Sequence, residues 1–149
     1  MTNREELNSF FVSCFNSILR AEEKALESIS NGKLTIKEIH FIEAVFKAQA
    51  VQENCASTIA NLLGVTLGTL TTSFSKLEQK GYLYKEQDRN DKRIFYIVPT
   101  RLAELVNKEH TAFHEKMVDK VVKLFPEEKT ENLVEILKTL DKFFSEYRN

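Results

Sequence analysis

The chain has 149 residues, a formal net charge of −1, and 42% hydrophobic residues. This length is typical of one domain with a substantial core, and the balanced charge excludes a nonspecific polycation. Four glycines and two prolines leave few helix breakers, which predicts a mostly helical protein. No apolar stretch of membrane length is present, and an amphipathic pattern follows the first residues in place of a signal peptide. We therefore expect a cytoplasmic protein with no membrane partner.

The first predicted helix spans about residues 4–30 and carries a broad apolar stripe. The stripe consists of Leu7, Phe10, Phe11, Cys14, Phe15, Ile18 and Leu19. Cys14 is surrounded in sequence by apolar side chains, which predicts a buried, inert thiol. The other cysteine, Cys55, is far away in sequence beside Ala56, so no disulfide framework is expected.

Residues 57–80 predict two short helices joined by a tight turn. Ser57 and Thr66 are candidate N-caps, and Gly64 is suited to the left-handed conformation that ends the first helix. On the second helix Leu67, Leu70, Phe74 and Leu77 form an apolar side. The opposite face is short-chained and rich in hydroxyls, with one lysine and no carboxylate, which favours close approach to base edges in a major groove. Its members are Gly68, Thr69, Thr72, Ser75, Lys76 and Gln79.

A β-hairpin is predicted directly after these helices. Residues 82–85 and 94–98 are rich in aromatic and β-branched side chains, as strands are. The connection between them carries Arg89, Lys92 and Arg93, with Asp91 as a partner that orients Arg93. Arginines in an exposed hairpin beside such a helix are suited to the minor groove or to the DNA backbone. Over residues 51–100 six basic side chains stand against five acidic ones, so geometry must contribute more than charge.

A long helix from about residue 100 to 124 follows, and Pro126 precedes a last helix with its own apolar stripe. That stripe contains Leu133, Ile136, Leu137, Leu140, Phe143 and Phe144. The predicted fold is all-α with a small β-wing, a winged helix-turn-helix at about residues 34–99 in a single domain over residues 1–149. The helices at about 4–30 and 100–147 would form a dimerisation region, although packing of both stripes inside one subunit is the alternative.

Four stretches resemble the MarR family of dimeric bacterial regulators. Asp91-Lys-Arg93, followed by apolar strand residues and Pro99-Thr100, is similar to the wing signature of the family. The sequence from Val65 to Ser73, with 77–82 and 113–118, is similar to the FabT-type branch, which represses fatty-acid synthesis genes. Pro99 and Ala103 depart from the usual family residues. The resemblance covers residues 6 to 147.

This resemblance implies a homodimer that binds an imperfect palindrome in double-stranded DNA, with two related helices in successive major grooves. The expected DNA-contacting residues are Ser57, Thr66, Gly68, Thr69, Thr72, Ser75, Lys76, Arg89, Lys92 and Arg93. The FabT-type branch further implies a long-chain acyl group on acyl carrier protein as effector. Its cavity would lie between the first and the long helix, lined by phenylalanines such as Phe15, and Arg20, Lys24 and Lys47 would help to dock the acidic carrier.

His40, His110 and His114 open an alternative. The last two are spaced i, i+4 on the long helix, which suits metal chelation. All three positions resemble the histidines of zinc-responsive MarR proteins, but Leu26 and Ile39 occupy the positions of two further carboxylate ligands. Glu22, Glu23 or Glu109 are possible substitutes. The sequence therefore favours an effector pocket with a hydrogen-bonded histidine cluster, with a zinc site as the alternative and no cofactor expected.

The sequence also bears on three other classes of protein. Cys14-Phe15 is faintly similar to the peroxide-sensing branch of the family, which leaves a peroxide or other small-ligand regulator as a further alternative. The chain has no Gly-rich phosphate loop and no readable Ser/His/Asp constellation, so an enzyme is not expected. A pure protein-dimerisation module would not need the hydroxyl-rich face and the arginine-bearing hairpin.

Overall fold

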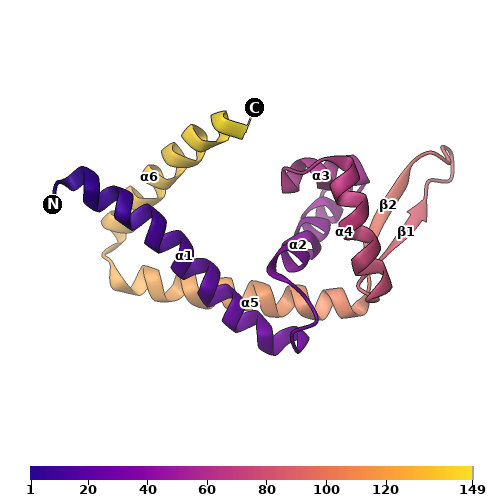
Figure 1. The fold of residues 1–149 in the computed structure, drawn as a ribbon, viewed down its shortest axis with the longest axis horizontal. Helices are drawn as coiled ribbons and strands as arrows, with labels where there is room; N and C mark the ends of the chain where they lie inside the picture. Colours follow the sequence, from indigo (N-terminus) through magenta and orange to yellow (C-terminus); the bar gives the residue numbers. More distant parts are fainter. Residues whose placement is uncertain (149) are drawn as a thin grey trace. The chain divides into compact units, whose positions relative to one another are not determined.

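The computed structural model describes residues 1–148 as six α-helices and one antiparallel hairpin (Figure 1). In chain order these are α1 (Asn3–Ser30), α2 (Ile36–Ala50), α3 (Ala56–Leu63), α4 (Leu67–Gln79), β1 (Leu83–Gln87), β2 (Phe95–Pro99), α5 (Arg101–Leu124) and α6 (Glu127–Ser145), with a 3-10 turn at Glu146–Arg148. The chain forms two compact units that divide within α5, one up to His110 and one from Thr111 onward. The predicted all-α fold with a small β-wing is confirmed.

The first two helices begin with capping boxes. At the start of α1 the Thr2 hydroxyl accepts from the Glu5 backbone N–H at 3.3 Å, and Glu5 accepts from the Thr2 N–H at 2.8 Å. Thr35 and Glu38 form the same reciprocal pair at the start of α2, at 3.2 and 2.9 Å. Each box satisfies backbone donors that a helix start leaves unpaired.

Helix α2 forms the centre of the first unit. Ile39, Ile42 and Val45 are essentially inaccessible to solvent, and α1, α3 and β2 all pack against this helix. From α4 the buried side chains are Leu70, Phe74 and Leu77, which is the periodicity predicted for its inner face. Leu67 is the exception, because it is exposed and does not join that face in the core.

The turn between α3 and α4 is built from local signals. Gly64 has φ 65°, the left-handed conformation, and its N–H bonds back to the end of α3. Thr66 caps α4, because its hydroxyl accepts from the Thr69 N–H at 3.2 Å. The expected Ser57 cap is wrong: Cys55 occupies the N-cap position of α3, and Ser57 lies inside the helix.

The hairpin pairs Leu83 with Pro99 and Gln87 with Phe95. Each strand starts one residue later than predicted, at Leu83 and at Phe95, because the residue before it makes other hydrogen bonds. The Tyr82 N–H still bonds to the Leu77 carbonyl and so belongs to the end of α4, while Ile94 exchanges hydrogen bonds with the hairpin tip. A third segment joins the sheet at its β2 edge, where Asn54 exchanges two hydrogen bonds with the backbone of Ile97.

The second unit comprises the rest of α5 and α6, which starts directly after Pro126. The apolar stripe of α6 is largely solvent-exposed, as is most of the stripe on α1, including Phe10 and Phe15. Cys14 is also exposed, so the expectation of a buried thiol is wrong for the single chain. Over the described residues, no helix combines the length and apolar character needed to cross a bilayer.

Candidate nucleic-acid interface

The polar face of α4 is open to solvent. Its members Gly68, Thr69, Thr72, Ser75, Lys76 and Gln79 are all exposed, opposite the buried Leu70, Phe74 and Leu77. Nothing lies within 4 Å of the position that a Cβ would take on Gly68, so this glycine leaves the first turn of the helix flat. The major groove of B-DNA admits an α-helix, and the short side chains on this face of α4 would allow it to approach the bases closely.

The hydroxyl protons on this helix are directed along its own backbone. Thr72 donates to the Gly68 carbonyl at 3.2 Å, and Thr71 and Ser75 donate in the same way one turn back. Thr66 donates to the Thr69 hydroxyl at 3.0 Å. Each of these hydroxyl oxygens keeps lone pairs that can accept from base amino groups, and an exposed threonine also offers a methyl group for contact with thymine methyls.

The tip of the wing, residues 88–93, is organised by Asp88. Its carboxylate accepts from the backbone N–H groups of Asn90 and Asp91 at 2.8 and 2.9 Å. It also accepts from the Tyr96 hydroxyl at 2.8 Å. These bonds lower the pKa of Asp88, and the bond to the carboxylate raises the pKa of Tyr96. Asp88 thus fixes the path of the turn that carries the basic side chains.

Arg93 is oriented by Asp91. Its Nε and Nη2 donate to the two carboxylate oxygens at 3.0 Å each, and its backbone N–H also bonds to Asp91. These hydrogen bonds lower the pKa of Asp91 and raise that of Arg93. The arginine side chain is nevertheless 90% exposed, so its remaining N–H groups face outward. The other two basic residues of the tip, Arg89 and Lys92, are exposed as well.

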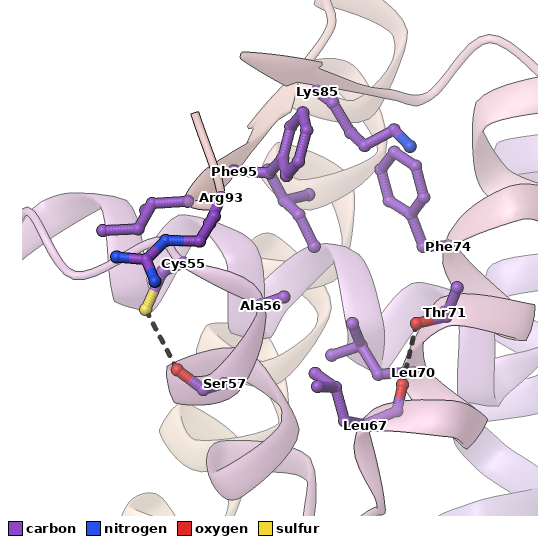
Figure 2. Close-up of a pocket in the computed structure, with 12 residues that line it drawn as sticks. Cys55, Ala56, Ser57, Leu67, Leu70, Thr71, Phe74, Lys85, Arg93 and Phe95 are labelled. Carbon is purple, nitrogen blue, oxygen red and sulfur yellow. Dashed lines mark hydrogen bonds between the residues drawn. The ribbon is translucent and has the colours of Figure 1, made fainter. Parts of the chain in front are cut away.

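A groove of about 490 Å³ lies between α3, α4 and the wing (Figure 2). Its floor is apolar and includes Leu67, which explains why this leucine is exposed, and Lys85 and Arg93 are its cations. The Lys85 ammonium lies 5.6 and 5.5 Å from the ring centroids of Phe74 and Phe95, so it connects the wing to α4.

Cys55 lies at the α3 end of this groove. Its thiol is 3.3 Å from the Ser57 hydroxyl, the contact drawn in Figure 2, and 3.2 Å from the Thr58 hydroxyl. These hydrogen bonds lower the pKa of the thiol. The position of Cys55 at the start of α3 was not predicted from the sequence.

A second candidate site joins α1, α2 and α5 within the first unit. Glu22 is buried, and its Oε1 lies 2.9 Å from His40 Nε2 and 2.6 Å from His110 Nε2. The ring centroids of the two histidines are 5.7 Å apart. One ligand atom from each of the three residues falls within 4.8 Å of the others, which suits a metal ion. Glu22 thus provides the carboxylate that Leu26 and Ile39, both in the core, cannot.

Two further residues were predicted for the effector site, His114 and Phe15. His114 belongs to the second unit, where its ring meets Phe113 edge-on with centroids 5.3 Å apart. Phe15 is exposed on α1, about two helical turns before Glu22. Within the first unit, the cluster consists of His40, His110 and Glu22.

The chain is similar to known proteins in both sequence and fold. A sequence profile of the MarR family matches residues 51–95, and curated proteins give no match. Among solved structures, Streptococcus pneumoniae FabT in complex with DNA is 31% identical over 97% of this chain and 99% of that chain, with a TM-score of 0.89. Zinc-responsive ZitR of Lactococcus lactis is 25% identical over 96% and 99%, with a TM-score of 0.71. The S. aureus MepR–DNA complex, 20% identical over 89% and 96% with a TM-score of 0.71, shares the fold.

The helix-turn-helix and the hairpin beside it define a winged-helix DNA-binding transcription regulator. The chain belongs to the MarR family, and its similarity to the FabT structure extends over nearly its whole length.

Proposed function

We propose that this regulator is a homodimeric repressor that reads an imperfect palindrome with α4 and the wing. The observation that carries the proposal is the exposed polar face of α4, which bears hydroxyls and one lysine but no carboxylate. It lies next to a wing whose arginine is already oriented. The exposed apolar stripes of α1 and α6 support the homodimer, because an isolated chain would leave them in water.

The DNA-binding test starts without a known operator. Binding of the purified protein to a library of genomic fragments, followed by sequencing of the retained DNA, should yield a two-fold related motif. Its half-sites should be about one helical turn, roughly 10 base pairs, apart. A motif without two-fold symmetry, or a monomer in sedimentation experiments with the operator, contradicts the proposal.

We further propose that the effector is a long acyl chain carried on acyl carrier protein, and that the genes are those of fatty-acid synthesis. The whole-chain similarity to FabT supports this, together with Arg20 and Lys24, exposed cations on α1 suited to an acidic carrier. Long-chain acyl carrier protein should change operator affinity, whereas the same carrier without an acyl chain should not. By linkage, operator DNA must change the affinity for the acylated carrier by the same factor.

A zinc-responsive regulator is the second candidate, favoured by the Glu22–His40–His110 cluster. Two imidazoles and a carboxylate are zinc ligands, and three protein ligands leave a fourth position open. In this case the protein should bind about one metal ion per subunit, chelation should change operator affinity, and His110→Ala should abolish that response. If the protein binds no metal and responds to acylated carrier protein, the zinc-responsive candidate is excluded. If DNA binding depends on zinc and does not respond to the carrier, the acyl-responsive candidate is excluded.

A further inference from the structure

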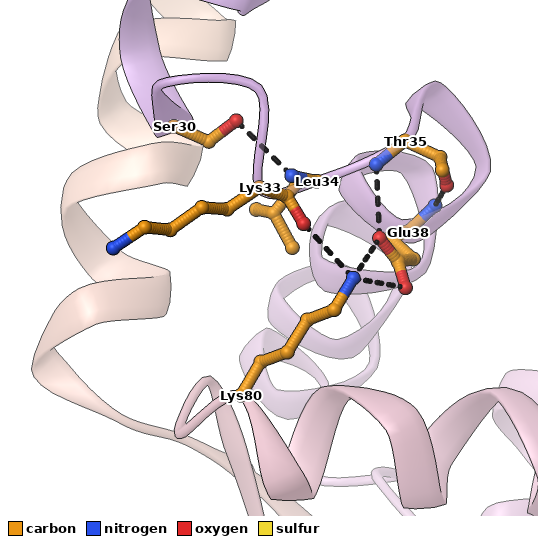
Figure 3. Close-up of polar contacts among 6 residues, drawn as sticks. All are labelled: Ser30, Lys33, Leu34, Thr35, Glu38 and Lys80. Atoms are coloured by element: carbon orange, nitrogen blue, oxygen red, sulfur yellow. Dashed lines mark hydrogen bonds and ion pairs between the residues drawn. The ribbon is translucent and has the colours of Figure 1, made fainter.

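Lys80, directly after α4, is held by three contacts within the protein, although its side chain is still 38% exposed. Its Nζ donates to both carboxylate oxygens of Glu38 at 2.9 Å and to the Lys33 carbonyl at 2.9 Å (Figure 3). An ammonium group has three protons, so these contacts occupy all of them. Lys80 thus differs from Lys76, one turn earlier, whose ammonium makes no ion pair among the described residues.

The partner of Lys80 is fixed in its turn. The Glu38 side chain is only 10% exposed and forms the capping box of α2 with Thr35. Burial raises the pKa of this carboxyl, but the bonds from Lys80 and Thr35 outweigh burial and hold it below its ordinary 4.5. Lys33 lies in the connection between α1 and α2. One ammonium therefore ties the end of α4 to the first turn of the central helix and to the loop before it.

The contacts of Lys80 are made at one end of α4, where they can limit a tilt of the whole helix. With 13 residues α4 is about 20 Å long, so a tilt of about 10° about one end moves the other by roughly 3 Å. Hydrogen bonds to bases tolerate only a few tenths of an ångström. The inner face of α4 packs through Leu70, Phe74 and Leu77, and such apolar contacts are not directional. The directional hydrogen bonds of Lys80 therefore restrict a tilt of α4 more strongly than these apolar contacts do.

We propose that Lys80 is a positioning residue for DNA reading, which sets the orientation of α4 through Glu38 and the Lys33 carbonyl and does not itself contact DNA. This inference rests on the proposed reading role of α4. The competing explanation is that Lys80 is a phosphate contact, as basic residues of a DNA-binding region often are. The two explanations predict opposite effects for the loss of Glu38.

The test uses the full-length protein with Glu38→Gln, Lys80→Met and the double variant. Glutamine also supports a capping box, so Glu38→Gln keeps the start of α2 intact and remains informative if Lys80→Met fails to fold. Glu43→Gln is the matched control, because it removes the same charge from α2 where the partner is the exposed Lys47. Affinities for operator and for non-operator DNA are measured by fluorescence anisotropy over a series of salt concentrations.

We expect both single variants to lower the operator-to-non-operator affinity ratio about 5- to 20-fold relative to Glu43→Gln. The affinity ratio of the double variant should be no lower than that of the single variant with the lower ratio, because the two single variants remove the same contact. The slope of log affinity against log salt should be unchanged. Tighter binding by Glu38→Gln, or a slope flattened by about 0.9 in Lys80→Met, would identify a phosphate contact and overturn the proposal. An unchanged ratio in both variants overturns it as well.

Failure of this inference is distinguishable from failure of the proposed function. Thr72→Ala, on the polar face of α4, is measured in the same assay. If it changes sequence preference while the Glu38 and Lys80 variants do not, α4 reads DNA and only the positioning role is wrong. If it has no effect, the reading role of α4 itself is wrong.

Discussion

The Asp91–Arg93 pair allows the role of charge in the wing to be separated from the role of orientation. The guanidinium has five N–H groups, and Asp91 takes two of them. Three remain for a phosphate or for the minor groove, enough for one two-pronged contact. Arg93→Ala removes both the positive charge and the planar set of N–H donors, whereas Arg93→Lys keeps the charge alone. Asp91→Ala keeps the arginine but removes the carboxylate that orients it.

The expected losses follow from this count. One oriented arginine contact corresponds to about a 10- to 100-fold change in operator affinity, which we expect for Arg93→Ala. Arg93→Lys should recover only part of it, because an ammonium cannot reproduce the planar fork. Asp91→Ala should weaken operator binding while binding to non-operator DNA becomes slightly tighter, because an acidic group has been removed. Lys120→Ala, on the exposed surface of α5, is the control for loss of a positive charge.

Fluorescence anisotropy with the operator at several salt concentrations measures all four variants. Equal operator affinity for Arg93→Ala and Lys120→Ala would refute the contact. Full recovery by Arg93→Lys would show that charge alone acts there. Operator binding by Asp91→Ala at wild-type strength would show that orientation by the aspartate is unimportant.

Three further predictions concern α4, the wing tip and the turn. Thr72→Ala should change base preference, and Thr72→Val and Thr72→Ser show whether the methyl or the hydroxyl group is responsible. Lys76→Ala should weaken binding to all DNA sequences and flatten the slope of log affinity against log salt by about one; a slope equal to that of the wild type contradicts this. Because the pKa of Asp88 is lowered, its contribution to wing stability should be complete above pH 3.8 and lost as the pH falls through its folded pKa; carboxyl titration by NMR at or above 3.8 contradicts this. Gly64→Ala should cost about 1 kcal/mol, roughly 2–4 °C in Tm, whereas Gly68→Ala, with ordinary helical φ, should not lower the Tm.

Local sequence signals were sufficient for most of the fold. Gly64 and Thr66 specify the turn through their own conformational preferences, and the spacing of Leu70, Phe74 and Leu77 specifies the inner face of α4. The error at Ser57 has a tertiary cause. Because Asn54 pairs with β2, the extended backbone continues to Cys55 and α3 starts earlier than a local hydroxyl cap implies.

The candidate sites were harder to predict because they join distant parts of the chain. Glu22 is separated from His110 by 88 residues, and Lys80 from Glu38 by 42. No periodicity in a single sequence encodes such a pairing. Glu22 was only one of three substitutes for a missing ligand, and its burial on α1, a signal visible only in the fold, selects it.

The same pairings determine how strongly charge contributes to DNA binding. Of the six basic residues within 51–100, all of them described, Lys80 is neutralised by Glu38, Arg93 is shared with Asp91, and Lys85 lies over two phenyl rings. Lys76, Arg89 and Lys92 make no ion pair within this range. In the proposed dimer these would meet about six phosphates, which corresponds to a salt slope near −5. A much steeper slope would require that Arg93, or cations from outside the reading helix and the wing, also meet phosphates, whereas a slope near this value would leave most of the specificity to the geometry of α4.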